Sequence, residues 1–249
     1  MTDAAAPAAR IRAQAGFESR TLLTNGEQLL VSLVLPALAL IGLAVSTAPH
    51  LGSGRRIDLA VPGVLALAVV STAFTGQAIA TGFDRRYGVL RLLGTTPLGR
   101  AGLLWAKAIA VLSIVAAQTV VLAVLGACFG WHPHAGGVVI GIVLLVVGSW
   151  VWVSLALALA GVLRAEATLA VANLIWVLLA AFGGLLVPTD RLPGGFGDIA
   201  RLLPSGALGD GMRAALTGHD THLLMPVLVL LVWGAIGSAL VARFFRWSD

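Results

Sequence analysis

The sequence predicts an all-α integral membrane protein with six transmembrane helices, an N-terminal interfacial helix, a short cytoplasmic helix and an outer re-entrant helix pair. Three observations support this fold class. Hydrophobic residues make up 59% of the 249 residues and charged residues only 11%, whereas soluble domains average about 25% charged residues. Several segments stay apolar over the roughly 20 residues that a membrane-crossing helix needs. The arginines gather at the ends of these segments, which favours a membrane surface over nucleic acid as their partner.

The apolar segments define six spans. The third span is long enough to tilt or to continue beyond the membrane on one side. In chain order the predicted spans are Leu29–Thr47, Leu59–Phe83, Ala101–Phe129, Val138–Leu163, Thr168–Val187 and Leu223–Phe245.

The basic residues predict the orientation of the chain. With the N-terminus inside, eleven of the sixteen Lys and Arg residues lie in inner segments and five in outer segments. Because Lys and Arg collect on the cytoplasmic side, both termini are expected in the cytoplasm. A single lysine against fifteen arginines is typical of a GC-rich bacterial genome. We therefore expect a multi-pass protein of a bacterial plasma membrane.

A short helix is predicted before the first span, over residues 10–26. Asn25-Gly26 would end it. Its apolar residues gather only weakly on one side. It is therefore either a helix lying in the inner interface or an ordinary cytoplasmic tail.

The segment 84–100, between the second and third spans, is the most strongly basic block of the chain. Asp84 can cap a helix over Arg85–Leu93, and Gly94 would end that helix. Thr96 would then cap the next helix, with Pro97 in its first position. The alternative is a basic loop that only fixes the topology.

The outer segment 188–222 is rich in glycine and proline, yet it also carries many apolar residues. Asp198 and Asp210 are each followed by an arginine three residues later, which predicts two short helices opened by aspartate. Pro204 separates them. The pair either dips back into the outer leaflet, where protein must cover its backbone, or lies on the outer surface.

Polar residues inside the predicted spans are candidates for a transport pathway or for helix packing. They are Thr72, Thr75, Gln77, Gln118 and Asn173. Charges are scarce in the spans, apart from Lys107 near an inner end, which argues against a proton relay and so against a cation-coupled secondary transporter.

Enzyme and metal chemistry have little support in the sequence. Ser205, Asp210 and His219 could belong to an intramembrane enzyme, but nothing in the sequence brings them together, and Ser205 is expected as a helix cap. The five histidines all fall on the outer side, and the pairs His132/His134 and His219/His222 are expected to be solvated, so no metal site is predicted. The sequence also lacks the G-x-x-x-x-G-K-[ST] phosphate loop, so ATP would have to bind another polypeptide.

The order of several motifs resembles the type-2 ABC exporter permeases, particularly the drug- and lipid-exporting branch. The motif around the basic block is Phe83-Asp84-Arg85-Arg86-x-Gly88-x-Leu90-x-x-Leu93-x-x-Thr96-Pro97-x-x-Arg100. Further along come Gly183-Gly184-x-x-x-Pro188, Leu192-Pro193, Ile199-Ala200, Leu203-Pro204 and Arg213. The resemblance covers nearly the whole chain. Members of this family often carry Glu near Asp84, so the contact made at this position differs here.

The resemblance implies a transmembrane subunit that exports a hydrophobic or amphipathic substrate, such as a drug or lipid, with polysaccharide export left open. Two ATPase subunits carrying ATP and Mg²⁺, and a second permease that is identical or homologous, would complete the transporter; this chain would bind no cofactor itself. The implied ATPase-coupling residues are Asp84, Arg85, Arg86, Tyr87, Gly88, Leu90, Arg91 and Leu93. The implied outer-gate residues are Pro188, Leu192, Pro193, Asp198, Arg201, Pro204, Asp210 and Arg213.

Overall fold

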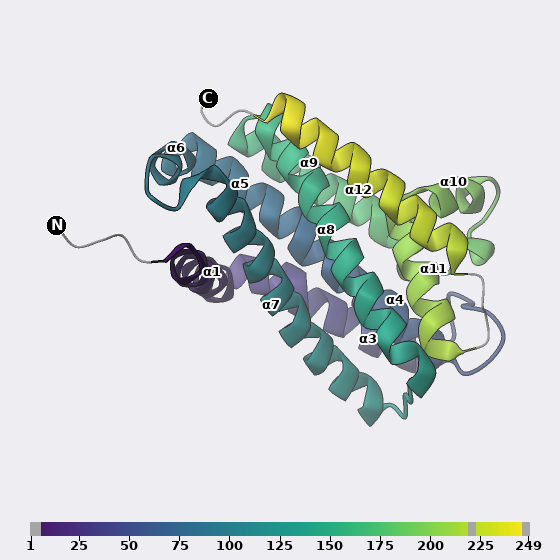
Figure 1. Ribbon diagram of the computed structural model, residues 1–249. Coiled ribbons are helices and arrows are strands. Elements are labelled where there is room, and N and C mark those ends of the chain that lie inside the picture. Colours follow the sequence, from purple (N-terminus) through teal and green to yellow (C-terminus); the bar gives the residue numbers. More distant parts are fainter. Residues whose placement is uncertain (1–5, 219–222, 246–249) are drawn as a thin grey trace.

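The computed structural model describes residues 6–218 and 223–245, and these residues form helices and connecting loops without a β-strand (Figure 1). The all-α fold class is confirmed. The helices are α1 (Pro7–Thr24), α2 (Gly26–Leu29), η1 (Leu30–Val34), α3 (Leu35–Val45), α4 (Arg56–Val69), η2 (Val70–Gly76), α5 (Gln77–Arg86), α6 (Val89–Gly94), α7 (Gly99–Cys128), η3 (Ala135–Gly137), α8 (Val138–Val162), α9 (Ala165–Phe182), η4 (Thr189–Arg191), α10 (Phe196–Leu202), α11 (Pro204–Thr217) and α12 (Leu224–Phe244).

Within the described residues, five helices are long and apolar enough to cross a membrane. They are 56–86, 101–128, 135–162, 165–182 and 224–244. The remaining predicted span corresponds to the shorter apolar helix Leu30–Val45. The span predicted over Thr168–Val187 ends early, at Phe182, because the chain turns at Gly183 and Gly184.

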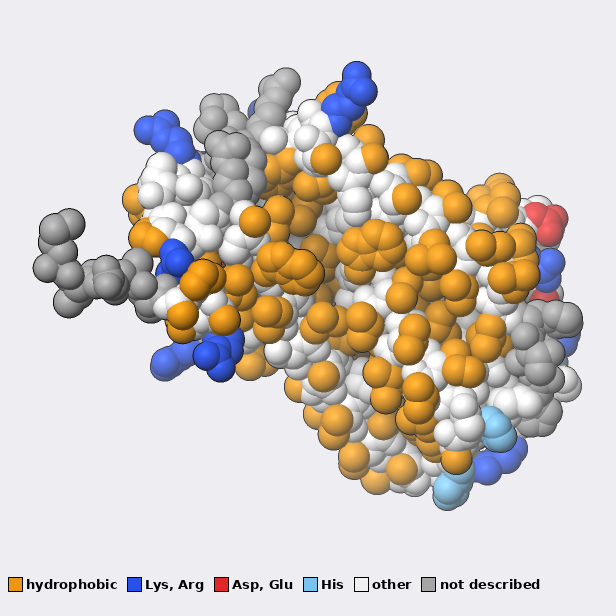
Figure 2. Space-filling view, in the orientation of Figure 1, with side chains coloured by type: hydrophobic (Ala, Val, Ile, Leu, Met, Phe, Trp, Pro, Cys, Tyr) orange, Lys and Arg blue, Asp and Glu red, His pale blue; other side chains and the backbone are white. Residues whose placement is uncertain are grey.

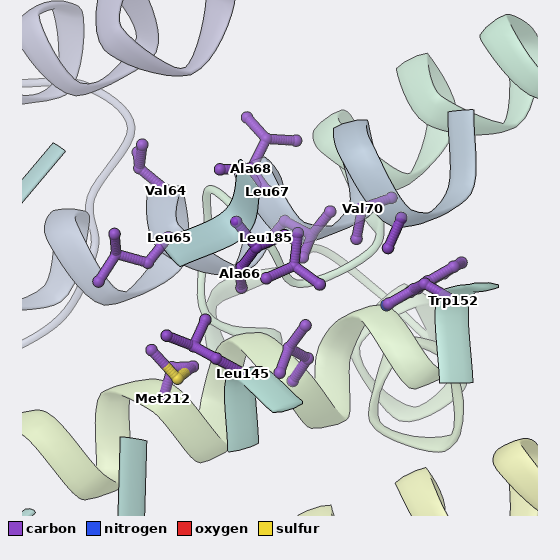
Figure 3. Close-up of a cluster of buried hydrophobic side chains, with 14 of the residues drawn as sticks. Val64, Leu65, Ala66, Leu67, Ala68, Val70, Leu145, Trp152, Leu185 and Met212 are labelled. Carbon is purple, nitrogen blue, oxygen red and sulfur yellow. The ribbon is translucent and has the colours of Figure 1, made fainter. Parts of the chain in front are cut away.

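The helix made of α4, η2 and α5 lies at the centre of the molecule. Nearly all of its apolar residues are buried. Figure 3 shows Val64 to Val70 of this helix packed with Leu145 and Trp152 of α8, with Leu185, and with Met212 of α11. The helix winds as a π-helix over η2, and η1 is π-helical as well. The two π-helical segments contact one another.

On the face shown in Figure 2, the charged side chains gather at the two ends of the molecule, with an apolar band between them. At one end lie α1, α6 and the C-terminal end of α12; at the other lie α10 and the end of α11 (Figure 1). The first and last described helices therefore reach the same end, which is consistent with the predicted placement of both termini on one side. α1 crosses the long helices and packs against α7.

Candidate coupling surface and outer helix pair

Three helices meet at the ammonium group of Lys107, which lies on α7. Its Nζ donates hydrogen bonds to Asp84 Oδ2 at 2.8 Å and to Glu18 Oε2 at 3.0 Å. The Lys107 side chain is only 2% exposed. A buried charge is stable only when it is paired, so these contacts tie α1 and α5 to α7. From the sequence, Lys107 was predicted only as an isolated charge near an inner span end, and Glu18 was not predicted as its partner.

The short helix of the basic block begins later than predicted. Asp84 is not its N-cap, because α5 continues through Arg86. The helix breaks at Gly88, whose φ of +72° is the left-handed conformation that glycine adopts at least cost, and α6 starts at the next residue. Pro97 is likewise not the first residue of the next helix, since α7 begins at Gly99.

The two arginines that follow Asp84, both implied coupling residues, have different surroundings. Arg85 is buried and donates from Nη1 to Ala160 O and from Nη2 to Leu163 O, both at 2.7 Å. It thereby satisfies carbonyl groups at the C-terminal end of α8, which the helix itself leaves without partners. Arg86 is exposed and forms an ion pair with Glu166 at the start of α9. Of the two, only Arg86 presents its charge at the surface.

Large apolar side chains are exposed on α1, on α6 and in the turn between α5 and α6. Tyr87 is 70% exposed, Leu92 68% and Phe17 64%. A crevice of about 580 Å³ separates α1 from the segment after α6, and Arg10 donates to the carbonyl of Pro97 across it. We call the exposed side chains and this crevice the α1–α6 surface. Exposed apolar groups at a charged end of a molecule are typical of a protein-binding surface.

The other predicted coupling residues divide between the interior and this surface. Leu90 is the buried residue of α6 and holds this helix against the bundle. Leu93, on the same helix, lines the crevice. Arg91 is exposed, as is Gly88.

At the opposite end, α11 is buried against α4, α8 and α12. Arg213 fastens it there. The guanidinium donates from Nη1 to Gly184 O at 2.8 Å, from Nη2 to Leu185 O, and from Nε to Leu59 O at 3.3 Å. Burial lowers the pKa of Arg213, and the carboxylate of Asp210 opposes this shift. The guanidinium thus joins α4, the turn after α9 and α11.

Asp210 accepts hydrogen bonds from two partners. Its Oδ1 lies 3.1 Å from Arg213 Nη1, and its Oδ2 accepts from the hydroxyl of Thr189. Arg201 Nε also approaches that hydroxyl, at 3.3 Å. Asp210 thus forms an ion pair with the arginine three residues later in the sequence. The prediction that Asp210 opens a helix is wrong, because α11 starts six residues earlier at Pro204.

The outer-gate residues therefore do not form one cluster. Thr189, Arg201, Asp210 and Arg213 lie together with Pro188 around a cavity of about 700 Å³. Leu192 and Pro193 lie in the turn before α10, and Asp198 lies in the first turn of α10, where it was predicted. The side chains of Phe196, Ile199 and Leu202 on α10 are exposed. The structure thus buries α11 and leaves α10 at the surface.

Glycines allow this close packing. Gly184 has φ of +79°, and a Cβ at this position would lie 2.8 Å from the Cα of Gly206 on α11. A Cβ at Gly63 on α4 would collide with Leu185 O and with the Arg213 guanidinium. The role of Gly63 was not predicted, although a glycine inside an apolar helix can indicate that another backbone approaches closely.

The five predicted pathway residues lie in or near the central helix, except for Asn173, which is half-buried on α9. Thr72 Oγ1 donates to Gln118 Oε1 at 2.9 Å, and Gln77 Nε2 donates to a threonine hydroxyl one turn later at 3.0 Å. Thr75 Oγ1 is buried without a hydrogen-bond partner among the described residues. Whether they line a pathway stays a prediction.

The residues considered for metal binding and enzyme chemistry do not form a site in the described part of the chain. That part holds no group of three or more His, Cys, Asp or Glu side chains suited to a metal ion. Ser205 is not a helix cap, since Leu203 precedes the first turn of α11 and the Ser205 hydroxyl is buried without a partner there. His219 and His222 lie outside the described residues.

Comparison with known proteins identifies the family. A family model described as "ABC-2 type transporter" matches residues 17–217, from the middle of α1 to the end of α11. No curated protein matches the chain. The matched range contains Lys107 and its two partners, α6 and the α11 anchor. The chain belongs to the ABC-2 type transporter family and is a transmembrane subunit of an ABC transporter.

Proposed function

We propose that this subunit exports a hydrophobic or amphipathic substrate across the bacterial plasma membrane, with both termini in the cytoplasm. ATP hydrolysis and its Mg²⁺ belong to two separate ATPase subunits, because this chain has no phosphate loop and its only lysine is engaged with two carboxylates. A second permease subunit, identical or homologous, completes the pathway. The described spans are almost without charge, which suits an apolar cargo better than an ion.

The observation that carries this proposal is the joint formed by Lys107. It links α1, α5 and α7 directly behind the α1–α6 surface. A force applied to α6 by a bound ATPase therefore reaches the central helix through α5 and the neighbouring helix through α7. Arg85 extends the connection to α8. If the basic segment 84–100 were only a loop that fixes the topology, three helices joined by a buried ion pair would not be needed behind it.

The outer helix pair serves as the exit lid in this mechanism. α11 is fastened at its buried face by Arg213, whereas α10 stays exposed. Opening the pathway outward requires that α11 leave its place against α4 and α8. The hydrogen bonds of Arg213 to Gly184 O and Leu59 O would then have to break or move.

A secondary transporter is the alternative function. Its coupling to protons or cations would need titratable groups at depth in the spans. The charged residues buried in the described long helices are Lys107 and Arg85. Lys107 is paired with two carboxylates, and Arg85 is bonded to two carbonyl groups at the end of α8. An intramembrane enzyme has less support, since the Ser205 hydroxyl is buried and has no hydrogen-bond partner among the described residues.

The test is co-purification from native membranes in mild detergent, with matched variants at the two ends of the molecule. Leu92→Asp places a charge on the α1–α6 surface, and Leu202→Asp places one on α10; the two side chains are 68% and 61% exposed. If Leu92 contacts an ATPase, burying an unpaired carboxylate costs more than about 1.4 kcal/mol and reduces the bound ATPase at least about tenfold.

The Leu202→Asp variant should retain the ATPase at the wild-type level. A wild-type chain that purifies without any ATPase would refute the exporter proposal. Equal retention of the ATPase by both variants would refute the assignment of the α1–α6 surface.

A further inference from the structure

The cavity of about 700 Å³ at the outer helix pair has a charged lining of three arginines and two aspartates. We call it the outer cavity. When all five groups are ionised, one positive charge is left without a balancing negative charge. The five residues are Asp190, Arg191, Arg201, Asp210 and Arg213.

Two of these charges neutralise one another in the wall of the outer cavity. Asp210 Oδ1 lies 3.1 Å from Arg213 Nη1, and the second oxygen of Asp210 accepts from the hydroxyl of Thr189. The Arg213 side chain is only 6% exposed, and its guanidinium donates to three carbonyl groups. Neither Asp210 nor Arg213 therefore carries an unpaired charge.

The other two arginines of the outer cavity keep unused donors. Arg201 is exposed, and its Nε lies 3.3 Å from the hydroxyl of Thr189. Arg191 Nε lies 3.2 Å from Asp190 Oδ2, but both side chains of this pair are at least 40% exposed, so solvent weakens it. The Nη atoms of Arg191 and Arg201 make no hydrogen bond among the described residues. Phosphate oxygens are the acceptors that such paired guanidinium donors fit best.

The exposed face of α10 indicates that the outer cavity lies at the membrane surface. Phe196, Ile199 and Leu202 on this helix are exposed apolar residues. The ring of Phe196 stacks on the ring of Phe182, the last residue of the spanning helix α9, with centroids 5.5 Å apart. The apolar face of α10 thus continues the apolar surface of a span. Arg201 lies on the same helix, where a long basic side chain reaches the level of the lipid headgroups.

The lining of the outer cavity also continues onto an exposed apolar strip of α12. Met225 lines the cavity from the first turn of this helix. Met225, Leu228 and Val232 are 62%, 45% and 56% exposed, and their spacing of three and four residues places them along one face. The strip therefore leads from the charged cavity toward the apolar band. An acyl chain attached to a bound phosphate would cover this strip, whereas a free phosphate ion would leave it bare.

We propose that the outer cavity binds the phosphate group of an anionic phospholipid of the outer leaflet between Arg191 and Arg201. One acyl chain lies along the strip of α12 that begins at Met225. The unbalanced positive charge favours an anionic lipid, since a zwitterionic headgroup would bring its own cation beside two guanidinium groups. This site goes beyond the proposed export function and depends on the proposed orientation only for the name of the leaflet.

The bound lipid would connect elements that are far apart in the sequence. Arg191 lies in η4, Arg201 in α10 and Met225 in α12. A lipid that contacts all three joins the outer helix pair to the last span. It acts there as a bound component of the protein and not as the cargo.

Photolabelling of the full chain in phosphatidylcholine nanodiscs tests the site without an ATPase. The probe is phosphatidylglycerol with a diazirine in one acyl chain. Adducts are expected on the first half of α12, from Met225 to Val232. Unlabelled phosphatidylglycerol should displace the probe. Diacylglycerol with the same chains lacks the phosphate, so at least about tenfold more of it should be needed.

Substitutions of the two arginines test the role of the guanidinium groups. Arg191→Gln and Arg201→Gln should each reduce the adducts on α12 by at least about fivefold, because a charge-assisted hydrogen bond to the phosphate is lost. Arg201→Lys keeps the cation and should retain most of the labelling. The matched control is Arg55→Gln, which removes a positive charge near the end of α11 but lines a different cavity. It should leave the labelling unchanged.

Several outcomes would overturn the proposal. Equal displacement by phosphatidylglycerol and diacylglycerol, or adducts spread evenly over all exposed helices, would refute a phosphate site. Equal protection by inorganic phosphate in the buffer would refute the lipid and assign the cavity to a free anion. An equal loss of labelling in Arg201→Lys and Arg201→Gln would show that Arg201 has only a structural role.

The fate of the proposed function is a separate result. A chain that binds no ATPase but shows the expected labelling would refute the export function and leave the lipid site in place. A chain that binds its ATPase but shows no labelling of α12 would refute the lipid site alone.

Discussion

Replacing Lys107 by methionine should release α1 from the rest of the molecule. The substitution keeps an unbranched side chain in the buried position but leaves the carboxylates of Glu18 and Asp84 without their shared cation. Removing one partner of a buried ion pair costs about 3–5 kcal/mol. The two carboxylate side chains are 13% and 28% exposed, so they can partly turn toward water. We therefore expect a cost at the lower end of this range, about 3 kcal/mol. This cost shifts the equilibrium between docked and released α1 roughly a hundredfold toward the released form.

Cysteine labelling can measure this shift. Ala15 lies on the buried face of α1 and is 5% exposed. In a chain with Cys128→Ser and Ala15→Cys, a membrane-impermeant maleimide added to inside-out vesicles reacts only when α1 lifts away. If lifting and return are fast, the labelling rate follows the population of the open form. Lys107→Met should raise this rate by roughly a hundredfold.

The control is Arg12→Met, which removes an exposed cation from the same helix. It should change the labelling rate by less than about threefold, as expected for a solvent-exposed charge. The reasoning would be refuted if Lys107→Met left the rate within that margin. The joint at Lys107 would then not hold α1 in place.

Three further predictions concern the outer helix pair and the orientation. Gly184→Ala should lower the thermal stability in detergent far more than Gly194→Ala: both glycines have positive φ, but only at Gly184 would the new Cβ collide with α11. Arg213→Lys keeps the charge but cannot reach several carbonyls at once, so it should destabilise the protein by about 2–3 kcal/mol; unchanged unfolding would contradict this anchor. With Cys128 removed, cysteine at Thr95 should react only from inside and cysteine at His132 only from outside; the reverse result would overturn the topology.

The membrane spans could be predicted because the length of an uninterrupted apolar segment is enough to indicate a membrane-crossing helix. Pro204 at the start of α11 and Asn25 after the last residue of α1 also follow from local rules, since proline suits the first turn and Asn-Gly ends a helix. Such signals depend only on neighbouring residues, which the sequence contains directly.

The partners of the buried charges could not be predicted. Lys107 pairs with Glu18, which lies 89 residues away, and Arg85 caps a helix that ends 75 to 78 residues later. No local pattern marks such contacts. Asp84 was misassigned as a cap because the break at Gly88, which leaves Asp84 inside α5, was not predicted. The helix end predicted at Gly94 is confirmed, since α6 ends at this residue.

The π-helical segment η2 affects how substitutions along the central helix should be interpreted. A π-helical turn inserts one extra residue relative to an α-helix, and each residue of an α-helix turns by about 100°. A helical wheel drawn for the whole stretch Arg56–Arg86 with one uniform angle therefore assigns residues after Gly76 to the wrong side. A scan of substitutions along this span will show two periodic patterns out of phase with each other. Scans on either side of η2 should therefore be analysed separately.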